Sequence, residues 1–578
     1  MKWNVLQADQ DLVKQYMNEL DINEIMATIL INRNVDLETA NILLNNPALA
    51  IQDPKLLINS ETAALEIIEA VENQAEIWVF GDYDVDGITS GYVMTDFLKS
   101  TTDNTVYPYY PNRSEGYGLN MDFCKALVQR KREESIEHML VITVDNGTSC
   151  IEEIQYLKDN GINIVVTDHH KAKATLPNCT VVNPHITDDP VYHHLCGCGV
   201  AYKMIQVIQD LVGMSKDYTE KYLFAVAFGT IADVMPMTPE NIALIKLGLE
   251  QVNSSKCHKA MKYFKDYIGK NNLNPNTVAW DVAPRLNACG RMGDIEKSAI
   301  LFYMDEDRKT DIMDTIIEIE ELNEERKALT KKAEKEIEKM DFSNDYACIF
   351  DASNYPGGIS GVIAGKMAEK LGKLALVVSG SNDVLVGSAR SPEGLNLQIF
   401  LNNELKKGNL ISFGGHENAA GFTVHIDKLV DLQDSLNEQI KAFVEEHGIE
   451  EQEEPTITID CQIDLDCLNK VVYEDINSLP YDNNGFASPV FSIHNLQVLK
   501  TRTSRNNKNN ICLTLQDMNG KQMDIWAWRL GELYNELGKP QFIDIVGTID
   551  QNFINKSQYT LNILDIKASG ENESSRAV

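Results

Sequence analysis

Ile77-Trp78-Val79-Phe80-Gly81-Asp82-Tyr83-Asp84-Val85-Asp86-Gly87-Ile88-Thr89-Ser90 is the stretch on which the interpretation of the whole chain depends. Its first four residues are apolar or β-branched and predict a buried strand, and a helical pattern follows from Val93. Asp82, Asp84 and Asp86 therefore lie at the carboxyl end of a strand, where open α/β sheets bind ligands. Three carboxylates this close repel one another unless a cation lies between them, so the stretch predicts a divalent metal site.

Two other interpretations of these acids have to be weighed. Asp-x-Asp-x-Asp-Gly also begins the calcium loop of an EF-hand, which has a bidentate Glu at its twelfth position. Counting from Asp82, that position is Val93, and a strand rather than a helix precedes the loop. The EF-hand is therefore excluded. A solvated acidic turn is the second alternative, and its weight depends on whether later segments of the chain carry matching groups.

Further predicted strands also end in polar groups. Residues 106–110, 139–144 and 162–166 have strand patterns, and residues 151–158 have a helical one. This alternation predicts a mostly parallel, doubly wound sheet. Asp145 follows the strand at 139–144, and Asp168, His169 and His170 follow the strand at 162–166. Because carboxyl ends of parallel strands meet at one edge, we expect these side chains to converge.

Asp233, after the apolar run that ends at residue 232, is a further candidate. Carboxylates with one or two imidazoles form an oxygen and nitrogen ligand set, which suits Mn²⁺ or Mg²⁺ in a two-metal site better than a thiolate zinc site. Two such ions polarise a phosphoryl oxygen and activate a bridging water. The constellation therefore predicts phosphoester hydrolysis.

Composition sets the wider limits. The 578 residues predict three or four domains, and no window approaches the roughly eighteen uninterrupted apolar residues of a membrane span. The first residues lack the apolar core of a secretory signal, and the 11 cysteines show no CxxC spacing, so we expect reduced thiols in the cytoplasm. The formal net charge of -34 requires that any bound polyanion meets a local basic or metal-lined groove.

The motifs together resemble a known superfamily. Asp82 to Gly87, Asp145-Asn146-Gly147, Asp168-His169-His170 and Asp233 are similar to the four motifs of the DHH phosphoesterases, and residues 413–421 are similar to the Gly-Gly-His motif of the associated DHHA1 domain. Further stretches resemble specifically the RecJ family of single-strand-specific exonucleases: residues 111–118, 197–203, 283–291, 387–391 and 484–491. The resemblance covers nearly the whole chain.

The resemblance implies a role for each matching residue. It implies that Asp82, Asp84, Asp86, Asp145, His169 and Asp233 bind two Mn²⁺ or Mg²⁺ ions, with Asp145 between them and Asp82 as a ligand or an orienting group. It implies that His170 contacts the scissile phosphate or assists proton transfer and that Asp168 fixes a histidine tautomer. Residues implied to bind substrate are Arg113, Arg285, Arg390, Ser391, Gly415 and His416.

Three positions depart from the pattern or invite another interpretation. Phe80 stands where some superfamily members have a metal-binding His, and Pro356 stands where the RecJ pattern has one, which removes one expected substrate contact. Cys196 and Cys198 beside His193 and His194 fit no standard zinc spacing, so we expect small packing residues there.

The remaining sequence completes an α/β multidomain architecture. We expect a helical N-terminal cap at residues 1–60, a parallel-sheet DHH domain at 61–304, a long connecting helix at 305–342, a smaller α/β DHHA1 domain at 343–449 and a disordered tail at 569–578. A dimerising coiled coil is the alternative for the helix. Short alternating strands in residues 455–568 predict an OB-like nucleic-acid-binding barrel. The basic loop 500–508, with Trp526 and Trp528, is the candidate contact with a single strand. The alternative is that the loop is only solvated and that the two tryptophans only pack in the core.

Three functions are consistent with the sequence. The favoured one is a metal-dependent exonuclease that degrades single-stranded DNA in DNA repair and recombination; the family resemblance alone implies 5′ to 3′ polarity. The second is a phosphodiesterase of the same superfamily for short oligonucleotides or cyclic dinucleotides, and the third is a non-catalytic replication scaffold. We expect a cytoplasmic monomer that binds single-stranded DNA, with single-strand-binding protein or other repair and replication proteins as candidate partners and no membrane.

Overall fold

The computed structural model describes residues 1–172, 175–187, 190–380, 383–392, 394–447, 456–481, 487–505, 507–552 and 557–570. The chain forms two compact units. One contains residues 52–236 and 244–450, and the other contains residues 1–51, 237–243 and 451–578. No helix in the described residues is long and apolar enough to cross a membrane.

A five-stranded parallel sheet organises the first unit, as the sequence predicts. Its order is β3 (Val106–Tyr109), β2 (Glu76–Phe80), β4 (Met139–Val144), β5 (Asn163–Thr167) and β6 (Thr180–Val182), and every neighbouring pair is parallel. β6 has three residues and no distinctive pattern, so the sequence does not predict it. Because all strands point the same way, their carboxyl ends form one edge of the sheet.

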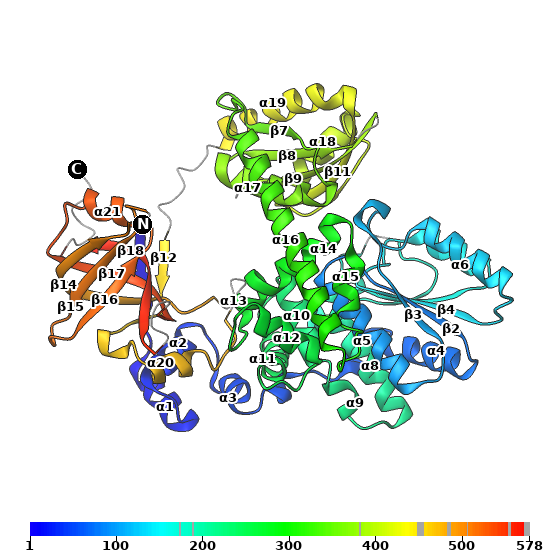
Figure 1. The fold of residues 1–578 in the computed structure, drawn as a ribbon, viewed down its shortest axis with the longest axis horizontal. Coiled ribbons are helices and arrows are strands. Elements are labelled where there is room, and N and C mark those ends of the chain that lie inside the picture. Colours follow the sequence, from blue (N-terminus) through cyan, green and yellow to red (C-terminus); the bar gives the residue numbers. More distant parts are fainter. Residues whose placement is uncertain are drawn as a thin grey trace. The chain divides into compact units, whose positions relative to one another are not determined.

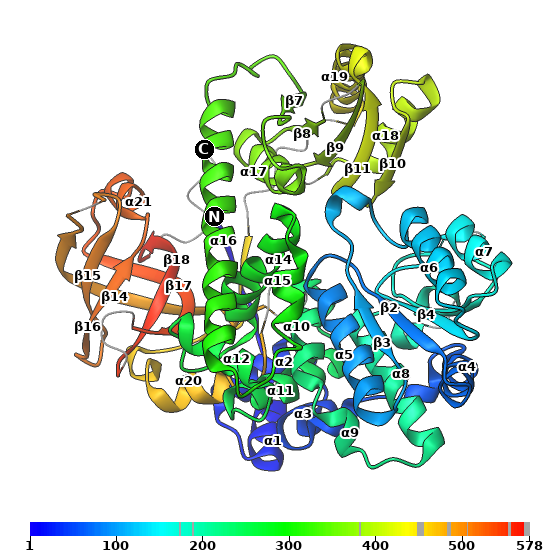
Figure 2. The same cartoon turned by 45° about the vertical axis from the view of Figure 1, so that its right-hand side comes forward.

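Helices cover both faces of this sheet (Figure 2). α6 (Met121–Glu133) and α7 (Ile151–Asp159) bury Phe123, Leu127 and Ile154 on one face. α4 (Ser60–Glu72), α5 (Val85–Thr101) and α8 (Gly197–Val212) lie on the other. α5 starts at the metal-site loop because the Asp84 carboxylate caps it, accepting the Gly87 amide N–H at 3.1 Å.

A helical layer continues the unit, with α10 (Leu223–Ala232), α12 (Lys259–Tyr267), α14 (Ala283–Met292) and the long α16 (Lys309–Ile337). α16 runs beside α14 and α17 (Ser360–Leu371) (Figures 1 and 2). The apolar residues that recur at three- and four-residue steps from Ile312 to Met340, Leu322 among them, predict a buried stripe that is only partly right. Ile312, Ile316, Ile319, Ala333 and Ile337 are buried, but Asn323 rather than Leu322 faces inward in the middle, and Met340 is 44% exposed.

A second sheet follows α16, in the order β10 (Ser412–Gly415), β11 (Ala419–His425), β9 (Val384–Arg390), β8 (Leu374–Ser379) and β7 (Ala347–Asp351). Only the β7–β8 pair is parallel. α17 and the end of α16 cover one face, and α18 (Leu397–Lys407) and α19 (Leu429–His447) cover the other. This is the smaller α/β domain that the sequence predicts.

The other unit contains the predicted C-terminal β-structure. Its sheet has the order β16 (Gln522–Ala527), β15 (Ile511–Gln516), β14 (Phe491–Thr503), β17 (Phe542–Gln551) and β18 (Tyr559–Ala568), all antiparallel, with β13 (Cys461–Gln462) beside β14. The architecture of parallel-sheet domain, long helix, smaller α/β domain and C-terminal OB-like domain is therefore confirmed.

The N-terminal residues belong to the same unit as this β-domain. The helices α1 (Gln10–Leu20), α2 (Glu24–Asn32) and α3 (Leu37–Asn45) follow a strand, β1 (Lys2–Val5), that pairs in parallel with β12 (Thr456–Ile459). The sequence does not predict β1, because four residues carry too short a pattern. The Arg33 Nε donates to Asp460 Oδ1 at 2.8 Å, which ties the end of α2 to β12. The acidic run at residues 450–455, which its charge and the closing Pro455 predict to be a linker, lies outside the described residues, as do residues 571–578.

Candidate metal centre

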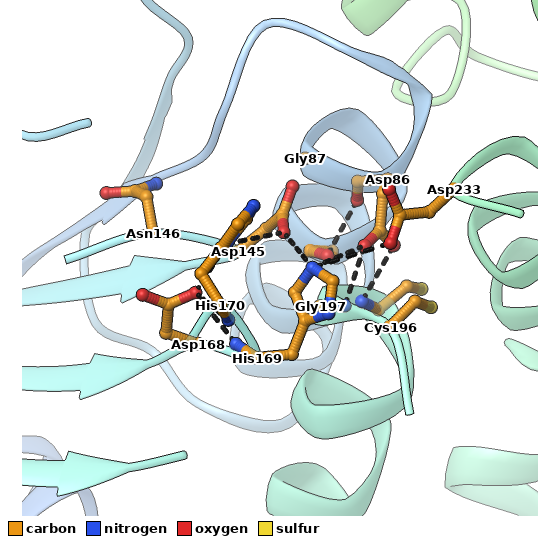
Figure 3. A network of polar contacts seen from close by, with 12 residues as sticks. Asp86, Gly87, Asp145, Asn146, Asp168, His169, His170, Cys196, Gly197 and Asp233 are labelled. Carbon is orange, nitrogen blue, oxygen red and sulfur yellow. Dashed lines mark hydrogen bonds and ion pairs between the residues drawn. The ribbon is translucent and has the colours of Figure 1, made fainter. Parts of the chain in front are cut away.

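The ends of β2, β4 and β5 and the end of α10 bring the predicted ligands together (Figure 3). Three overlapping groups have ligand atoms within 4.8 Å of one another: Asp82 with Asp84 and Asp145, Asp145 with His169 and His170, and Asp86 with His169 and Asp233. The His169 Nε2 lies 3.1 Å from Asp145 Oδ1, 3.7 Å from Asp86 Oδ2 and 3.6 Å from Asp233 Oδ2. His169 and Asp145 therefore lie where the groups overlap.

The start of α8 fixes one of these ligands. The backbone amides of Gly197 and Cys198 donate to the two oxygens of Asp86 at 2.6 and 2.9 Å. A helix N-terminus stabilises a carboxylate in this way, so Asp86 keeps its orientation before any metal binds. This Gly-Cys-Gly motif resembles the family pattern, but the sequence assigns it no role in the site. Chain order gives no sign that it reaches Asp86.

Asp145 has an unusual backbone. Its φ is 62°, in the left-handed region that costs most residues free energy, and Gly147 follows at 111°. A Cβ at Gly147 would lie 2.4 Å from the Thr143 Oγ1, so only glycine fits the turn. The buried Asn146 closes it by donating to the carbonyls of Val144 at 2.9 Å and Phe80 at 3.4 Å. This turn aims the Asp145 carboxylate across the strand ends.

Asp168 organises the histidines. It accepts backbone N–H groups from Thr148 at 3.0 Å, His169 at 2.7 Å and His170 at 3.1 Å, and its Oδ1 is 2.9 Å from His170 Nδ1. The Tyr117 hydroxyl lies 3.0 and 3.1 Å from the two ring nitrogens of His170. Tyr117 is half exposed, and the sequence does not identify it as part of the site.

The electrostatics show how strongly the site needs a cation. Burial, with the neighbouring carboxylates, raises the pKa of Asp86, Asp145 and Asp233, and raises the pKa of Asp82 to about 8. Burial lowers the pKa of His169. Burial would also lower the pKa of His170, but the hydrogen bond to Asp168 raises it to about 9. The folded protein thus holds several carboxylates whose charged form is destabilised.

Buried polar atoms without hydrogen-bond partners also indicate a cation site. Among the described residues, Asp82 Oδ1, Asp145 Oδ1 and His169 Nε2 are buried without a hydrogen-bond partner. Unpaired buried acceptors are costly and rare in folded proteins. Oxygen and imidazole donors with no partner match the ligand preferences of Mn²⁺ and Mg²⁺. Cys196 and Cys198 are buried free thiols and belong to none of the metal-capable groups of the described residues.

The predicted substrate residues lie in three places: after β3, in the smaller α/β domain and on α14. The Arg113 guanidinium stacks over the Tyr83 ring at 4.2 Å. In the smaller α/β domain, the pairing of Arg390 with Ala419 places Arg390 and Ser391 beside the β10–β11 turn that carries Gly415 and His416. The Ser391 Oγ donates to the carbonyl of Glu417 at 3.2 Å, and the His416 backbone N–H donates to the carbonyl of Ala419 at 2.8 Å.

Arg285 differs from the other predicted substrate residues because carboxylates already neutralise it. Its Nε forms an ion pair with Glu320 Oε2 at 2.5 Å, and its Nη1 lies 3.8 Å from Asp281 Oδ1. Nη1 also donates to the Asp281 carbonyl at 2.6 Å. The phosphate contact implied for Arg285 stays a prediction.

Three protein families match the chain, in the order of its domains. The DHH family, N-terminal domain, matches residues 76–230, the DHHA1 domain matches residues 344–442, and the RecJ OB domain matches residues 459–565. Together they cover more than half of the chain, including the sheet edge, the smaller α/β domain and the C-terminal barrel described above.

Several known proteins are also similar to this chain. The chain is 29% identical to the single-stranded-DNA-specific exonuclease RecJ of Bacillus subtilis (strain 168), over 98% of this chain and 71% of the relative. It is 31% identical to the RecJ of Thermus thermophilus, over 66% of this chain and 54% of that protein. The crystal structure of RecJ in complex with Mn²⁺ from Thermus thermophilus matches with a TM-score of 0.80 and 23% identity, over 98% of this chain and 79% of that one. The chain belongs to the RecJ-type group of the DHH phosphoesterase superfamily.

Proposed function

We propose that this protein is a Mn²⁺- or Mg²⁺-dependent exonuclease that hydrolyses phosphodiester bonds of single-stranded DNA in the 5′ to 3′ direction, in DNA repair and recombination. The observation that carries the proposal is the set of three overlapping metal-capable groups at one sheet edge. The RecJ relatives are described as single-stranded-DNA-specific exonucleases, and a crystal structure of exonuclease RecJ bound to manganese is 27% identical, with a TM-score of 0.57.

Asp82, Asp84, Asp86, Asp145, His169 and Asp233 would hold two ions, which supply a Lewis acid for the phosphoryl oxygen and an activated water. The chain itself orients these ligands before binding, through the α8 amides on Asp86 and the strained turn at Asp145. In the metal-free protein the hydrogen bond to Asp168 raises the pKa of His170 to about 9, which favours the protonated imidazole. A protonated imidazole suits contact with the scissile phosphate and donation of a proton to the leaving oxygen, rather than removal of a proton from water.

The C-terminal β-domain supplies a candidate strand contact. The rings of Trp526 and Trp528 stack at 5.0 Å with an interplanar angle of 12°, and Trp528 is 46% exposed. Two loops at the same end of the sheet carry Arg505, Lys508 and Arg529. The loops are joined by hydrogen bonds, from the Arg529 backbone N–H to the Asn510 side chain and from the Gly531 N–H to the Asn509 carbonyl. Aromatic platforms with nearby cations bind single strands with little sequence preference. This favours long strands over the dinucleotide alternative.

The cytoplasmic location and the monomeric state are part of the same proposal. All eleven cysteines lie in the described part of the chain and none forms a disulfide, which supports a reducing compartment. Single-strand-binding protein or other repair and replication proteins are the proposed protein partners, because free single strands are coated in cells.

The test is degradation of single strands labelled at the 5′ or the 3′ end, or protected in a duplex, with Mn²⁺, Mg²⁺ or EDTA. Asp145→Asn serves as the matched control because it removes a charge without changing volume. Release of mononucleotides from the 5′ end, only with metal and only with Asp145, supports the proposal. Cleavage of di- or trinucleotides alone would favour the small-substrate alternative, and binding without cleavage would favour the scaffold.

A further inference from the structure

Arg291 and Arg326 lie on neighbouring helices, and the charge of Arg326 acts on the Arg291 guanidinium. α14 and α16 pack side by side, and Arg285 of α14 meets Glu320 of α16. Six residues further along each helix, about 9 Å by the helical rise, stand Arg291 and Arg326. The first pair of charges attracts, whereas the second pair repels. Like charges at a helix interface disfavour each other's charged form, and an anion bound between them would relieve the repulsion.

Asp84 acts on Arg291 and Glu324 acts on Arg326 through their charges, but neither carboxylate forms an ion pair with the guanidinium. Among the described residues none forms an ion pair with Arg291, Arg326, Arg113 or Arg390, whereas Lys297 of α15 (Ile295–Ile300) and Lys366 and Lys370 of α17 each pair with a glutamate. Glu324, two residues before Arg326, forms an ion pair with Lys327 at 2.7 Å. Arg291 makes one long bond, at 3.3 Å, to the Gly358 carbonyl.

Buried donors of the same region lack acceptors. The Asn323 Oδ1 accepts from Arg326 Nη2 at 2.9 Å and so fixes the guanidinium. That leaves Asn323 Nδ2, Arg326 Nε and Arg113 Nε buried without partners. Asn323 is 1% exposed and lies on the buried face of α16, together with Ile316 and Ile319. All three orphaned groups are donors, and unsatisfied donors together with unpaired cations are complementary to an anion with several acceptor oxygens.

The site adjoins the metal centre. The charges of Arg113, Arg326, Asp84 and Arg390 all act on the Arg291 guanidinium, and burial with the neighbouring cations lowers its pKa to about 10. Gly358 packs directly on the Arg291 backbone, since a Cβ there would lie 2.2 Å from the Arg291 carbonyl oxygen. The donors therefore lie between the metal-bearing domain and the smaller α/β domain of the same compact unit.

We infer that Asn323 and Arg326 of the connecting helix, together with Arg291, bind a phosphate of the substrate strand, and that Arg285 holds α14 to α16 instead. The inference rests on the proposed function for the identity of the anion. It makes α16 a substrate-binding element as well as a connection. Arg285 donates to acceptors within the protein, whereas the Nε of Arg326 has no acceptor in the described part of the chain.

The test compares variants in binding and in stability. A 5′-phosphorylated, fluorescently labelled oligothymidylate is titrated at several salt concentrations with Ca²⁺, which holds the site without hydrolysis. For a single strand, removal of one phosphate-binding cation lowers the slope of log K against log salt by about 0.7. For Arg326→Gln we expect that decrease, an affinity about tenfold lower, and an unchanged or higher Tm. Arg285→Gln should keep the slope and lower the Tm, because Glu320 loses its partner.

Two more variants complete the design. Lys331→Gln removes an exposed cation of the same helix and should behave like the unaltered protein. Asn323→Asp supplies the missing carboxylate and should weaken binding as much as Arg326→Gln, so the inference remains testable if Arg326→Gln does not fold. Equal slopes for all variants, or a decrease for Arg285→Gln alone, would overturn it. Failure of the unaltered protein to cut strands with Mn²⁺ would refute the proposed function while leaving these binding differences measurable.

Discussion

Replacing Gly197 by Ala would place a methyl carbon 2.5 Å from both Cβ and Oδ1 of Asp145 and 2.7 Å from its Cγ. Ordinary contact begins near 3.4 Å, so the carboxylate would have to retreat by about 0.9 Å, beyond the roughly 0.5 Å within which functional groups must be held. The backbone cannot absorb this movement cheaply, because Asp145 is already at a φ of 62°. The helical backbone at position 197 accepts alanine without strain, so the effect is purely steric.

A displacement of this size at a metal ligand predicts a loss of about 10²-fold in rate or metal affinity, or about 2.7 kcal/mol. Mn²⁺ titration calorimetry and the metal dependence of strand cleavage measure it. The matched control is Gly365→Ala on α17, where an added Cβ meets nothing within 4 Å and a gain of about 0.5–1 kcal/mol in stability is expected. A folded Gly197→Ala protein with unaltered Mn²⁺ affinity and rate would refute the close packing of Asp145 against α8.

Three further outcomes are expected. In the folded metal-free protein the pKa of Asp82 is raised to about 8, against 3.8 in the unfolded chain. The folded state therefore binds the extra proton between these values, and the free energy of unfolding falls as pH rises from 3.8 to about 8. Thermal melts should show that the gain in Tm from Mn²⁺ over EDTA grows from about pH 6 to about pH 8.5, and a constant gain would contradict this. Asp168→Asn removes the charge that raises the pKa of His170 to about 9. The alkaline limb of the pH–rate profile should therefore move to lower pH, and the rate should fall about 10- to 100-fold. If the limb does not move, His170 is not the group that causes it. Trp528→Ala should weaken binding of a labelled oligothymidylate by about 1–3 kcal/mol without changing Mn²⁺ affinity, and equal strand affinity would show that the exposed ring is not a stacking platform.

Local patterns predicted most of the architecture. The apolar run before Asp82, the strand patterns ending at Asp145 and Asp168, and the long helical stripe all correspond to elements of the structure. These features depend on residues within one or two turns or strands, so period and composition specify them. The convergence of Asp82, Asp145 and His169 followed from one topological rule, that parallel strands end at a common edge.

Contacts between distant segments were beyond such patterns. The amides of Gly197 and Cys198 reach Asp86 from 111 and 112 residues away. Tyr117 meets a histidine 53 residues further on. β1 forms only because Thr456–Ile459 lies beside it. In each case the residue's own neighbours in sequence carry no special pattern, and tertiary packing alone creates the contact.

The same limit applies to charge. A net charge of -34 predicts that the protein repels polyanions, but repulsion at long range is a property of the whole surface, whereas binding depends on which cations lack partners. Arg285 and Arg291 stand in one short helix and look equivalent in sequence. Glu320, 35 residues from Arg285 in the sequence, forms an ion pair with Arg285, whereas the charge of Arg326 repels that of Arg291. Half-buried guanidinium groups that repel one another and form no ion pair destabilise the free protein, so binding of an anion would offset that cost at Arg291 and Arg326. An acidic protein can therefore bind a phosphate chain tightly at one place, provided that arginines without ion pairs are gathered there.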